Sequence, residues 1–267
     1  MRKNLLVLCT LALSFACSTD SPNVELPLPT QNFQVSLTPS VNEVFVDVPF
    51  TVKVEGNEGI FDISRIKENR VESITSLLPG VALADESLLI NLGFSFTGTE
   101  KVVLEFTSIS GKKFTKTLDF DVKRGNSVKI TGFKINSFHN MNGTWDPEYA
   151  DTDINRLADI QFGFRKLRHH HITHLSPSMS TWFLSPVYPN EQQLEFDLSQ
   201  NGLFISEDYT LGIGLIDVES DGTVQDLTMR YDELKIDFRE FKQSKPSEIN
   251  LSSEEYGYDI TLQLEWL

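Results

Sequence analysis

The sequence predicts an all-β protein, in which two tandem antiparallel β-sandwiches follow an N-terminal targeting segment and a short tether. Runs of alternating apolar and polar residues recur along most of the 267 residues, and turn-forming Gly, Pro, Asn and Asp separate them. Such runs at short spacing are typical of antiparallel strands in sandwiches. Hydrophobic residues make up 40% of the chain and include 19 Phe, so the sequence can fill two hydrophobic cores.

Residues 1–16 have the order of a secretory signal peptide. Arg2 and Lys3 form a basic start, Leu5 to Phe15 is an apolar stretch, and Ser14 and Ala16 are the small residues that a signal peptidase needs. The apolar stretch is shorter than the roughly 20 residues of a membrane-spanning helix. We therefore expect this segment to be removed from the mature protein.

Cys17 follows directly, and with it the segment resembles the signal of bacterial lipoproteins. The resemblance implies that a fatty acyl chain such as palmitate on Cys17 holds the protein on a membrane. An ordinary signal peptidase would also accept Ser14-x-Ala16 and would leave a soluble exported chain with a free Cys17. The other cysteine, Cys9, leaves with the signal, so the mature chain has no internal disulfide and depends on its hydrophobic cores for stability.

Residues 17–31 are expected to form an extended tether, because Pro22, Pro27 and Pro29 stand among small polar residues without any period. Fully stretched, this segment reaches roughly 45 Å at about 3.3 Å per residue.

The formal charge of −15 becomes about −17 once Arg2 and Lys3 are removed with the signal. So acidic a surface disfavours nucleic acids and anionic lipid headgroups as partners. It is compatible with cations, neutral glycans and basic protein surfaces.

Residues 32–123 predict the first sandwich. The segment Gly98 to Val122 contains two alternating runs around the turn Ile109 to Lys112, which indicates a β-hairpin. This segment resembles the closing hairpin of bacterial Ig-like and PKD-like modules, which implies such a β-sandwich here. The segment Asp62 to Asn69 interrupts the pattern, and we expect it to leave the sheet as a short helix or a loop. The remaining strands are expected at Phe33 to Leu37 and Phe50 to Val54.

Residues 127–267 predict the second sandwich, which follows a short charged hinge at Lys123 to Asn126. Because the hinge is short, we expect this domain to lie against the first one. Its final run, Tyr258 to Trp266, alternates strictly. The other expected strands are Val128 to Phe138, Ile160 to Phe164, Ser180 to Leu184, Leu194 to Leu198, Tyr209 to Ile216, Leu234 to Phe238 and Glu248 to Leu251.

Two loops of the second sandwich are rich in carboxylates, and hard cations such as Ca²⁺ require six to eight oxygen ligands. The spacing of Asp153 and Asp159, followed by Asp217-x-Glu219 after an apolar strand, resembles the two calcium-binding loops of C2 domains. The resemblance implies a C2-like sandwich and a calcium site formed by these four residues. Gln225 stands where that family has its next aspartate. The alternative is that the carboxylates simply face solvent in an acidic chain.

A histidine-rich run, Arg165 to His174, is the other local peculiarity. Imidazoles bind Zn²⁺ and Ni²⁺, which makes His169, His171 and His174 candidate ligands. On a strand, however, His169 and His171 point away from the side of His170, and the mature chain offers no further cysteine. We therefore favour a basic edge that docks an acidic surface over a metal site.

Trp145 and Trp182 are candidate ligand-binding residues, because exposed aromatic rings can stack on sugars. The alternative is that Trp182 and its neighbour Phe183 divide between core and surface, as adjacent residues on a strand do. An enzyme is not expected. The sequence has no Gly-x-Ser-x-Gly motif, no phosphate-binding loop and no Cys–His pair.

Taken as a whole, the chain resembles outer-membrane lipoproteins of the Bacteroidota, in which short signals and Ser-rich tethers precede tandem sandwiches. The resemblance implies an outer-membrane location, with the lipid anchor on the periplasmic or the cell-surface face. We expect a non-catalytic binding or scaffold protein that needs no cofactor and has an envelope protein or a glycan as its partner. The alternatives are a glycan-binding component of a polysaccharide-uptake system and a Ca²⁺-dependent C2-like module.

Overall fold

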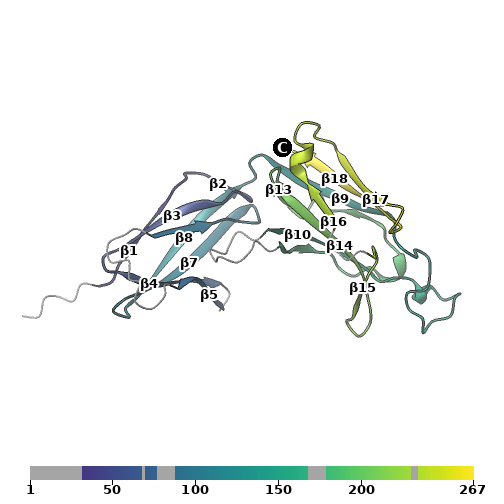
Figure 1. Ribbon diagram of the computed structural model, residues 1–267, viewed down its shortest axis with the longest axis horizontal. Helices are drawn as coiled ribbons and strands as arrows, with labels where there is room; N and C mark the ends of the chain where they lie inside the picture. The colour runs from purple at the N-terminus through teal and green to yellow at the C-terminus, as the bar shows by residue number, and fades with distance from the viewer. Residues whose placement is uncertain (1–31, 68–69, 77–87, 168–178, 230–233) are drawn as a thin grey trace, which may run out of the picture. The chain divides into compact units, whose positions relative to one another are not determined.

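A computed structural model of the protein describes residues 32–67, 70–76, 88–167, 179–229 and 234–267. These residues form an all-β protein with antiparallel sheets, which confirms the predicted fold class (Figure 1). Within them, no helix is long and apolar enough to cross a membrane. The helical segments are the 3₁₀ turns η1 (Ile154–Arg156), η2 (Pro189–Glu191) and η3 (Phe238–Phe241). The predicted signal peptide, Cys17, the tether and the histidines of the 165–174 run lie outside the described residues.

Two sheets enclose the first hydrophobic core. One has the strand order β1-β3-β6, with β1 (Val35–Pro39), β3 (Phe50–Gly56) and β6 (Leu88–Leu92). The other has the order β2-β8-β7-β4-β5, with β2 (Val44–Phe45), β8 (Lys113–Lys123), β7 (Gly98–Ser108), β4 (Ile60–Lys67) and β5 (Arg70–Ser76). Apart from the short parallel pair β2–β8, every pair is antiparallel. The predicted hairpin is confirmed, since β7 pairs with β8 from Gly98 to Thr107.

The expectation that the chain leaves the sheet at Asp62 is wrong, because β4 continues through Asp62 to Lys67; residues 68–69 lie outside the described residues. Two irregularities explain why the alternation is hidden there. The register of β4 against β7 shifts between Ile60 and Asp62, and its register against β5 shifts between Ile63 and Ser64. A bulge inserts one residue into a strand and so breaks the two-residue period on which the prediction depended.

Two further sheets enclose the second core. One has the order β11-β10-β14-β15, with β16 also pairing with β14; its strands are β11 (Met179–Leu184), β10 (Ile160–Leu167), β14 (Thr210–Val218), β15 (Val224–Asp226) and β16 (Leu234–Asp237). The other has the order β12-β9-β18-β17, with β13 also pairing with β9; its strands are β12 (Glu195–Asp197), β9 (Ser127–Ser137), β18 (Tyr258–Trp266), β17 (Glu248–Ser253) and β13 (Phe204–Ser206). Each of the eight strands expected in the second sandwich is therefore present, with small differences at its ends.

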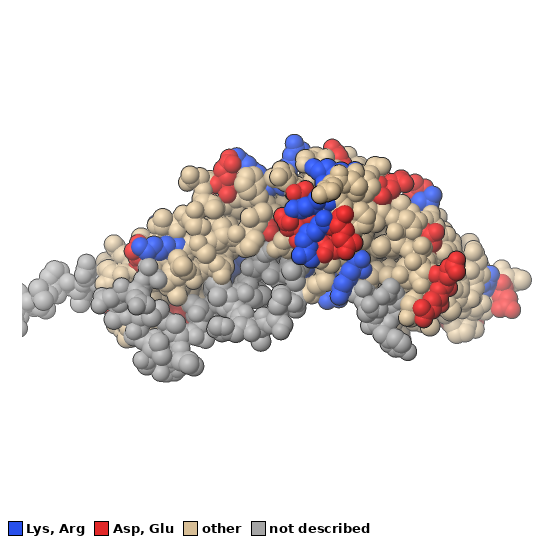
Figure 2. All heavy atoms as spheres, turned by 45° about the horizontal axis from the view of Figure 1, so that its top comes forward, with Lys and Arg blue, Asp and Glu red and all other residues tan. Residues whose placement is uncertain are grey.

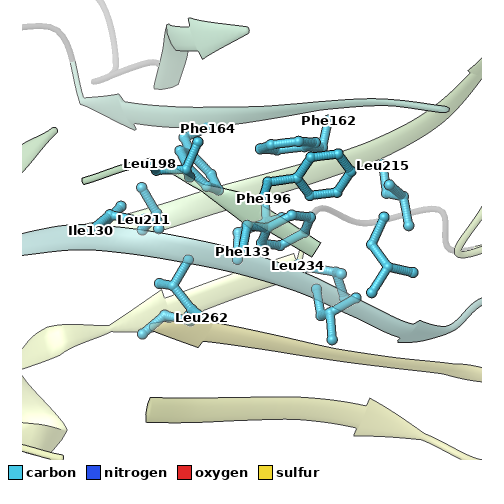
Figure 3. Close-up of a cluster of buried hydrophobic side chains, with 14 of the residues drawn as sticks. Ile130, Phe133, Phe162, Phe164, Phe196, Leu198, Leu211, Leu215, Leu234 and Leu262 are labelled. Atoms are coloured by element: carbon cyan, nitrogen blue, oxygen red, sulfur yellow. The ribbon is translucent and has the colours of Figure 1, made fainter. Parts of the chain in front are cut away.

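Aromatic rings from both of these sheets fill the second core (Figure 3). The ring of Phe133 on β9 stacks on that of Phe162 on β10 at a centroid distance of 4.5 Å. The ring of Phe196 on β12 lies 4.7 Å from that of Phe162. Both core clusters lie within the predicted ranges 32–123 and 127–267. Two further points stay predictions. One is the division into two domains at these bounds, and the other is the likeness of the first sandwich to Ig-like or PKD-like modules and of the second to C2 domains.

A buried ion pair connects the two cores, and residues Phe33–Leu267 form one compact unit. Lys166 on β10 is 1% exposed, and its Nζ lies 2.8 Å from Oδ1 and 3.0 Å from Oδ2 of Asp47, which follows β2. Asp47 also accepts a hydrogen bond from the backbone N–H of Ser206. Burial lowers the pKa of Lys166 to about 8, although the charge of Asp47 opposes that shift. Lys166 remains predominantly charged at neutral pH and holds segments that are far apart in the sequence together.

Candidate functional site: an acidic loop cluster

The loop between β9 and β10 brings Asp146 and Glu148 to one end of the second sandwich, and its backbone is organised by Arg156. The guanidinium of Arg156 donates hydrogen bonds to the carbonyls of Asp151, Asn142 and Gly143. In return, the backbone N–H groups of residues 145 and 146 point to the carbonyl of Arg156. The one arginine of this loop therefore shapes its backbone, and its charge is not paired with the carboxylates of the loop.

The turn between β14 and β15 supplies the other carboxylates. Glu219 closes the turn through a backbone hydrogen bond with Thr223, and its Oε1 accepts a hydrogen bond of 2.5 Å from Gln225 Nε2. Asp217 is the inward-facing residue at the end of β14 and is only 1% exposed. Gly222 has a φ of 85°, which a glycine adopts without strain in so tight a turn.

Asp146, Glu148, Asp217 and Glu219 act on one another electrostatically, and we call them the acidic cluster. Burial raises the pKa of Asp146 to about 7, with further contributions from a hydrogen bond to Glu219 and from the charges of the other cluster members. Such a hydrogen bond between two carboxyl groups needs a shared proton. Two carboxylates that share a site disfavour each other's ionisation.

Asp217 is the buried member of the acidic cluster. Its Oδ1 accepts a hydrogen bond of 2.6 Å from the backbone N–H of Asp159, but its Oδ2 has no hydrogen-bond partner in the described part of the chain. Burial and the charges of Glu219 and Asp159 raise the pKa of this carboxyl group. An unpartnered buried oxygen is uncommon and costly, and it indicates a place where a donor or a cation would be stabilised.

The acidic cluster has no ion pair with a lysine or arginine among the described residues, in contrast to carboxylates elsewhere on the chain. On the face that Figure 2 draws, several groups of acidic and basic side chains lie next to one another between larger areas of uncharged residues. Two exposed apolar side chains, Tyr149 and Ile154, belong to the same β9–β10 loop. The loop therefore combines uncompensated negative charge with apolar side chains that a partner could cover.

The structure brings together only part of the predicted calcium site. Asp159 and Asp217 are hydrogen-bonded, and Glu219 lies within their electrostatic reach. Asp153 instead caps η1 by accepting a hydrogen bond from the N–H of Asn155. The described residues contain no group of three or more His, Cys, Asp or Glu side chains that could hold a metal ion. Calcium binding stays a prediction. The acidic cluster also contains Asp146, which was not among the calcium ligands predicted from the sequence.

Both tryptophans that were candidates for sugar stacking are buried, so neither offers an open ring face. Trp145 is 9% exposed and donates a hydrogen bond from Nε1 to the carbonyl of Asn140. Trp182 is 8% exposed, donates to the carbonyl of Ser95 and lies under Lys166 Nζ at 3.8 Å from its ring centroid. The sugar-stacking interpretation of these two residues therefore loses its geometric basis, since both rings lie in the core.

A shallow hollow of about 130 Å³ lies on the β10–β14 part of the second sandwich. Gly163 on β10 pairs directly with Gly214 on β14, and a Cβ added at Gly214 would meet nothing within 4 Å. Glycine in a strand interior often marks a place where a ligand or another backbone approaches closely. The side chains of Gln161, Thr181, Leu184 and Ile216 border this hollow.

Comparison with known proteins adds little to this geometry. No protein-family model matches the chain, and no curated protein matches it. One solved structure, titled "Structural basis for the promiscuous specificity of the carbohydrate-binding modules from the beta-sandwich super family", aligns with 89% of this chain and 98% of its own chain. The two sequences are 10% identical and the TM-score is 0.26, so no ligand or residue role passes from that protein to this one.

Proposed function

We propose that this chain is a non-catalytic, lipid-anchored envelope protein that binds a basic protein surface through the acidic cluster and its loop. The observation that carries the proposal is that burial and neighbouring carboxylates raise the pKa values of Asp146 and Asp217, while the acidic cluster has no basic partner in the described part of the chain. A lysine or arginine of a partner would relieve this repulsion by pairing with the accessible members of the cluster, Asp146, Glu148 and Glu219. Tyr149 and Ile154 would supply the apolar contacts of such an interface.

The buried Lys166–Asp47 pair supports the scaffold part of the proposal. An ammonium group that contacts Asp47 and the carbonyls of Ser95 and Phe204 needs all of these segments in fixed positions. Such a junction restrains movement between the two cores, as the short hinge at Lys123 to Asn126 predicts. The first core would then act as a spacer for the binding end of the second.

Binding of an oligolysine peptide tests the proposed surface. We expect the mature protein to bind this peptide with an affinity that falls as salt rises, because ion pairs at a surface are screened. Removing the charges with Asp146→Asn, Glu148→Gln and Glu219→Gln should weaken binding severalfold. The matched control removes the same number of exposed carboxylates elsewhere, with Asp197→Asn, Glu195→Gln and Glu265→Gln. Equal losses in the two variants would show only general attraction to an acidic protein and would contradict the proposal.

Calcium provides a separate arm of this test. If the acidic cluster holds Ca²⁺, millimolar Ca²⁺ should raise the Tm more than Mg²⁺ does, because a ligand that binds only the folded state stabilises it. Asp217→Asn should abolish that difference. Oligolysine binding without a Ca²⁺-specific rise in Tm is the result that we expect.

A glycan ligand is the second candidate. The observation that favours it is the hollow on β10 and β14, in which Gly163 and Gly214 leave the sheet surface without side chains. The apolar face of a sugar ring can lie on a floor without side chains, with Gln161 and Thr181 as polar neighbours. Gly214→Val would fill the hollow, and the open space around Gly214 and its extended backbone should allow the variant to fold. Glycan-array binding that is present in the native protein and lost in this variant would support the candidate. Binding that persists would exclude this hollow as the glycan site.

A further inference from the structure

Two large apolar side chains are exposed at one end of the first sandwich. Phe61 is 42% exposed and Ile109 is 52% exposed. Phe61 is the residue that the bulge in β4 leaves unpaired, since Ile60 pairs with Ser108 and Asp62 pairs with Thr107. A bulge changes the direction in which a side chain points. Here it leaves the side chain of Phe61 exposed and without a residue opposite it on β7.

The same end receives the chain from its N-terminal side. Gln34 and Asn57 exchange two hydrogen bonds, so the entering chain lies against the turn between β3 and β4. The N–H of Ile109 donates to the carbonyl of Gly59 in that turn, which places the β7–β8 turn beside it. We call this region, formed by residues 33–34, 57–61 and 109–112, the tether end.

Most of the carboxylates near the tether end are paired with lysines, although the whole chain is strongly acidic; Asp62, next to Phe61, instead accepts a hydrogen bond from Ser64. Three carboxylates on the elements that meet there each have a lysine partner: Glu55 pairs with Lys53 at 2.6 Å, Glu58 with Lys112 at 3.1 Å and Glu105 with Lys113 at 2.7 Å. The general repulsion between an acidic protein and anionic headgroups is therefore weak at this place. Lysine side chains can also lay their methylene stems along an apolar surface while the ammonium group stays in water.

We propose that the tether end rests on the surface of a lipid bilayer, with Phe61 and Ile109 in the boundary between headgroups and acyl chains. The inference rests on the proposed lipid anchor at Cys17. A tether that reaches roughly 45 Å at most keeps this end close to the anchoring membrane. Confinement of this kind raises the effective concentration of a weak second contact. Because the acyl chains supply the attachment, this second contact acts mainly by giving the protein a preferred orientation on the membrane.

Fluorescence quenching on vesicles tests this placement with the acylated mature protein. An environment-sensitive dye is attached to Ile109→Cys or, as a matched control, to Tyr149→Cys in the second sandwich. Vesicles of phosphatidylcholine, with and without phosphatidylglycerol, carry a quencher on their lipids. We expect a blue shift and severalfold stronger quenching at position 109 than at position 149. Equal, weak quenching at both positions in protein that floats with the vesicles would overturn the inference while leaving the anchor intact.

Vesicle sedimentation of the unacylated Cys17→Ser mature protein removes the anchor from the test. Phe61→Ser with Ile109→Ser should reduce the vesicle-bound fraction severalfold, whereas Leu89→Ser, which removes another exposed side chain of the first sandwich, should not. Equal effects of both variants would overturn the inference. So would analytical ultracentrifugation that shows the native chain forming dimers through Phe61 and Ile109, because a second copy would then cover these residues.

Discussion

Ionisation of Asp146 is disfavoured by its partial burial and by the neighbouring carboxylates of the acidic cluster. Its pKa is raised from the ordinary value of 3.8 to about 7, so the folded state holds a proton that the unfolded chain has already released. Linkage gives the sign of the effect on stability. The stabilisation that this bound proton gives the folded state is complete below about pH 4 and is lost as the pH rises through about 7.

Asp146→Asn should therefore remove a pH dependence. We expect the free energy of unfolding of the native chain, measured relative to this variant by urea denaturation, to fall between about pH 4 and pH 7. Asp197→Asn is a control of opposite sign, because hydrogen bonds from Ser199 lower the pKa of Asp197. The stabilisation that the Asp197 carboxylate gives the folded state is lost as the pH falls. Parallel curves for the native chain and Asp146→Asn would contradict the proton sharing.

Lys166 and Asp47 form the other residue pair with a specific expectation. Lys166→Met leaves Asp47 charged and buried, and this should cost about 3–5 kcal/mol. The double variant with Asp47→Asn should recover much of that loss. Asn suits the position, because Asp47 has a φ of 60° and Asn tolerates left-handed backbone. Chemical denaturation of both single variants and the double variant gives the coupling energy, and additive losses would contradict the pairing.

The sequence identified three of the residues around the acidic cluster but not their arrangement. The sequence shows Asp159 just before an expected strand and Asp217 and Glu219 just after another one. Such positions can be recognised from the neighbouring residues alone. The participation of Asp146 depends on how the β9–β10 loop folds around Arg156, and no local pattern encodes that fold. The burial of Trp145 and Trp182 is likewise set by long-range contacts, with the carbonyl of Ser95 as the partner of Trp182.

Among the elements, strands with regular alternation were predictable and irregular ones were not. In β18, Tyr258, Ile260, Leu262 and Leu264 are buried, as the period of two indicates. In β4 the two bulges shift this period, and the pattern fails although the strand is present. The short strands β2, β13 and β15 have two or three residues each, which is too few to show any period.

The connection between β8 and β9 makes a specific demand on Gly125. Its φ is 58°, and a Cβ at this position would lie 2.8 Å from Cδ1 of Phe45. Gly125→Ala should lower the free energy of unfolding by at least about 1 kcal/mol, from backbone strain alone. Gly214→Ala is the matched control, because it has neither a positive φ nor a close neighbour. Thermal denaturation in which the Tm falls by the same amount in both variants would contradict this role of Gly125.

For the whole molecule, the acidic charge and the two cores could be anticipated from composition, but the connection between the cores could not. Nothing in the run Arg165-Lys166-Leu167 shows that Lys166 is buried, because lysine on a strand usually faces solvent. Its partner Asp47 stands far away in the sequence. Long-range ion pairs of this kind emerge only from the three-dimensional structure.

Membrane attachment is the central claim about the whole molecule, because the proposed scaffold role and the tether end both depend on it. Mass spectrometry of the mature protein, recovered from the separated membrane and soluble fractions of its native host, tests it most directly. The account predicts an N-terminal peptide that begins at Cys17 and carries fatty acyl chains, recovered in the membrane fraction. A bare Cys17 thiol on protein recovered from the soluble fraction would contradict it.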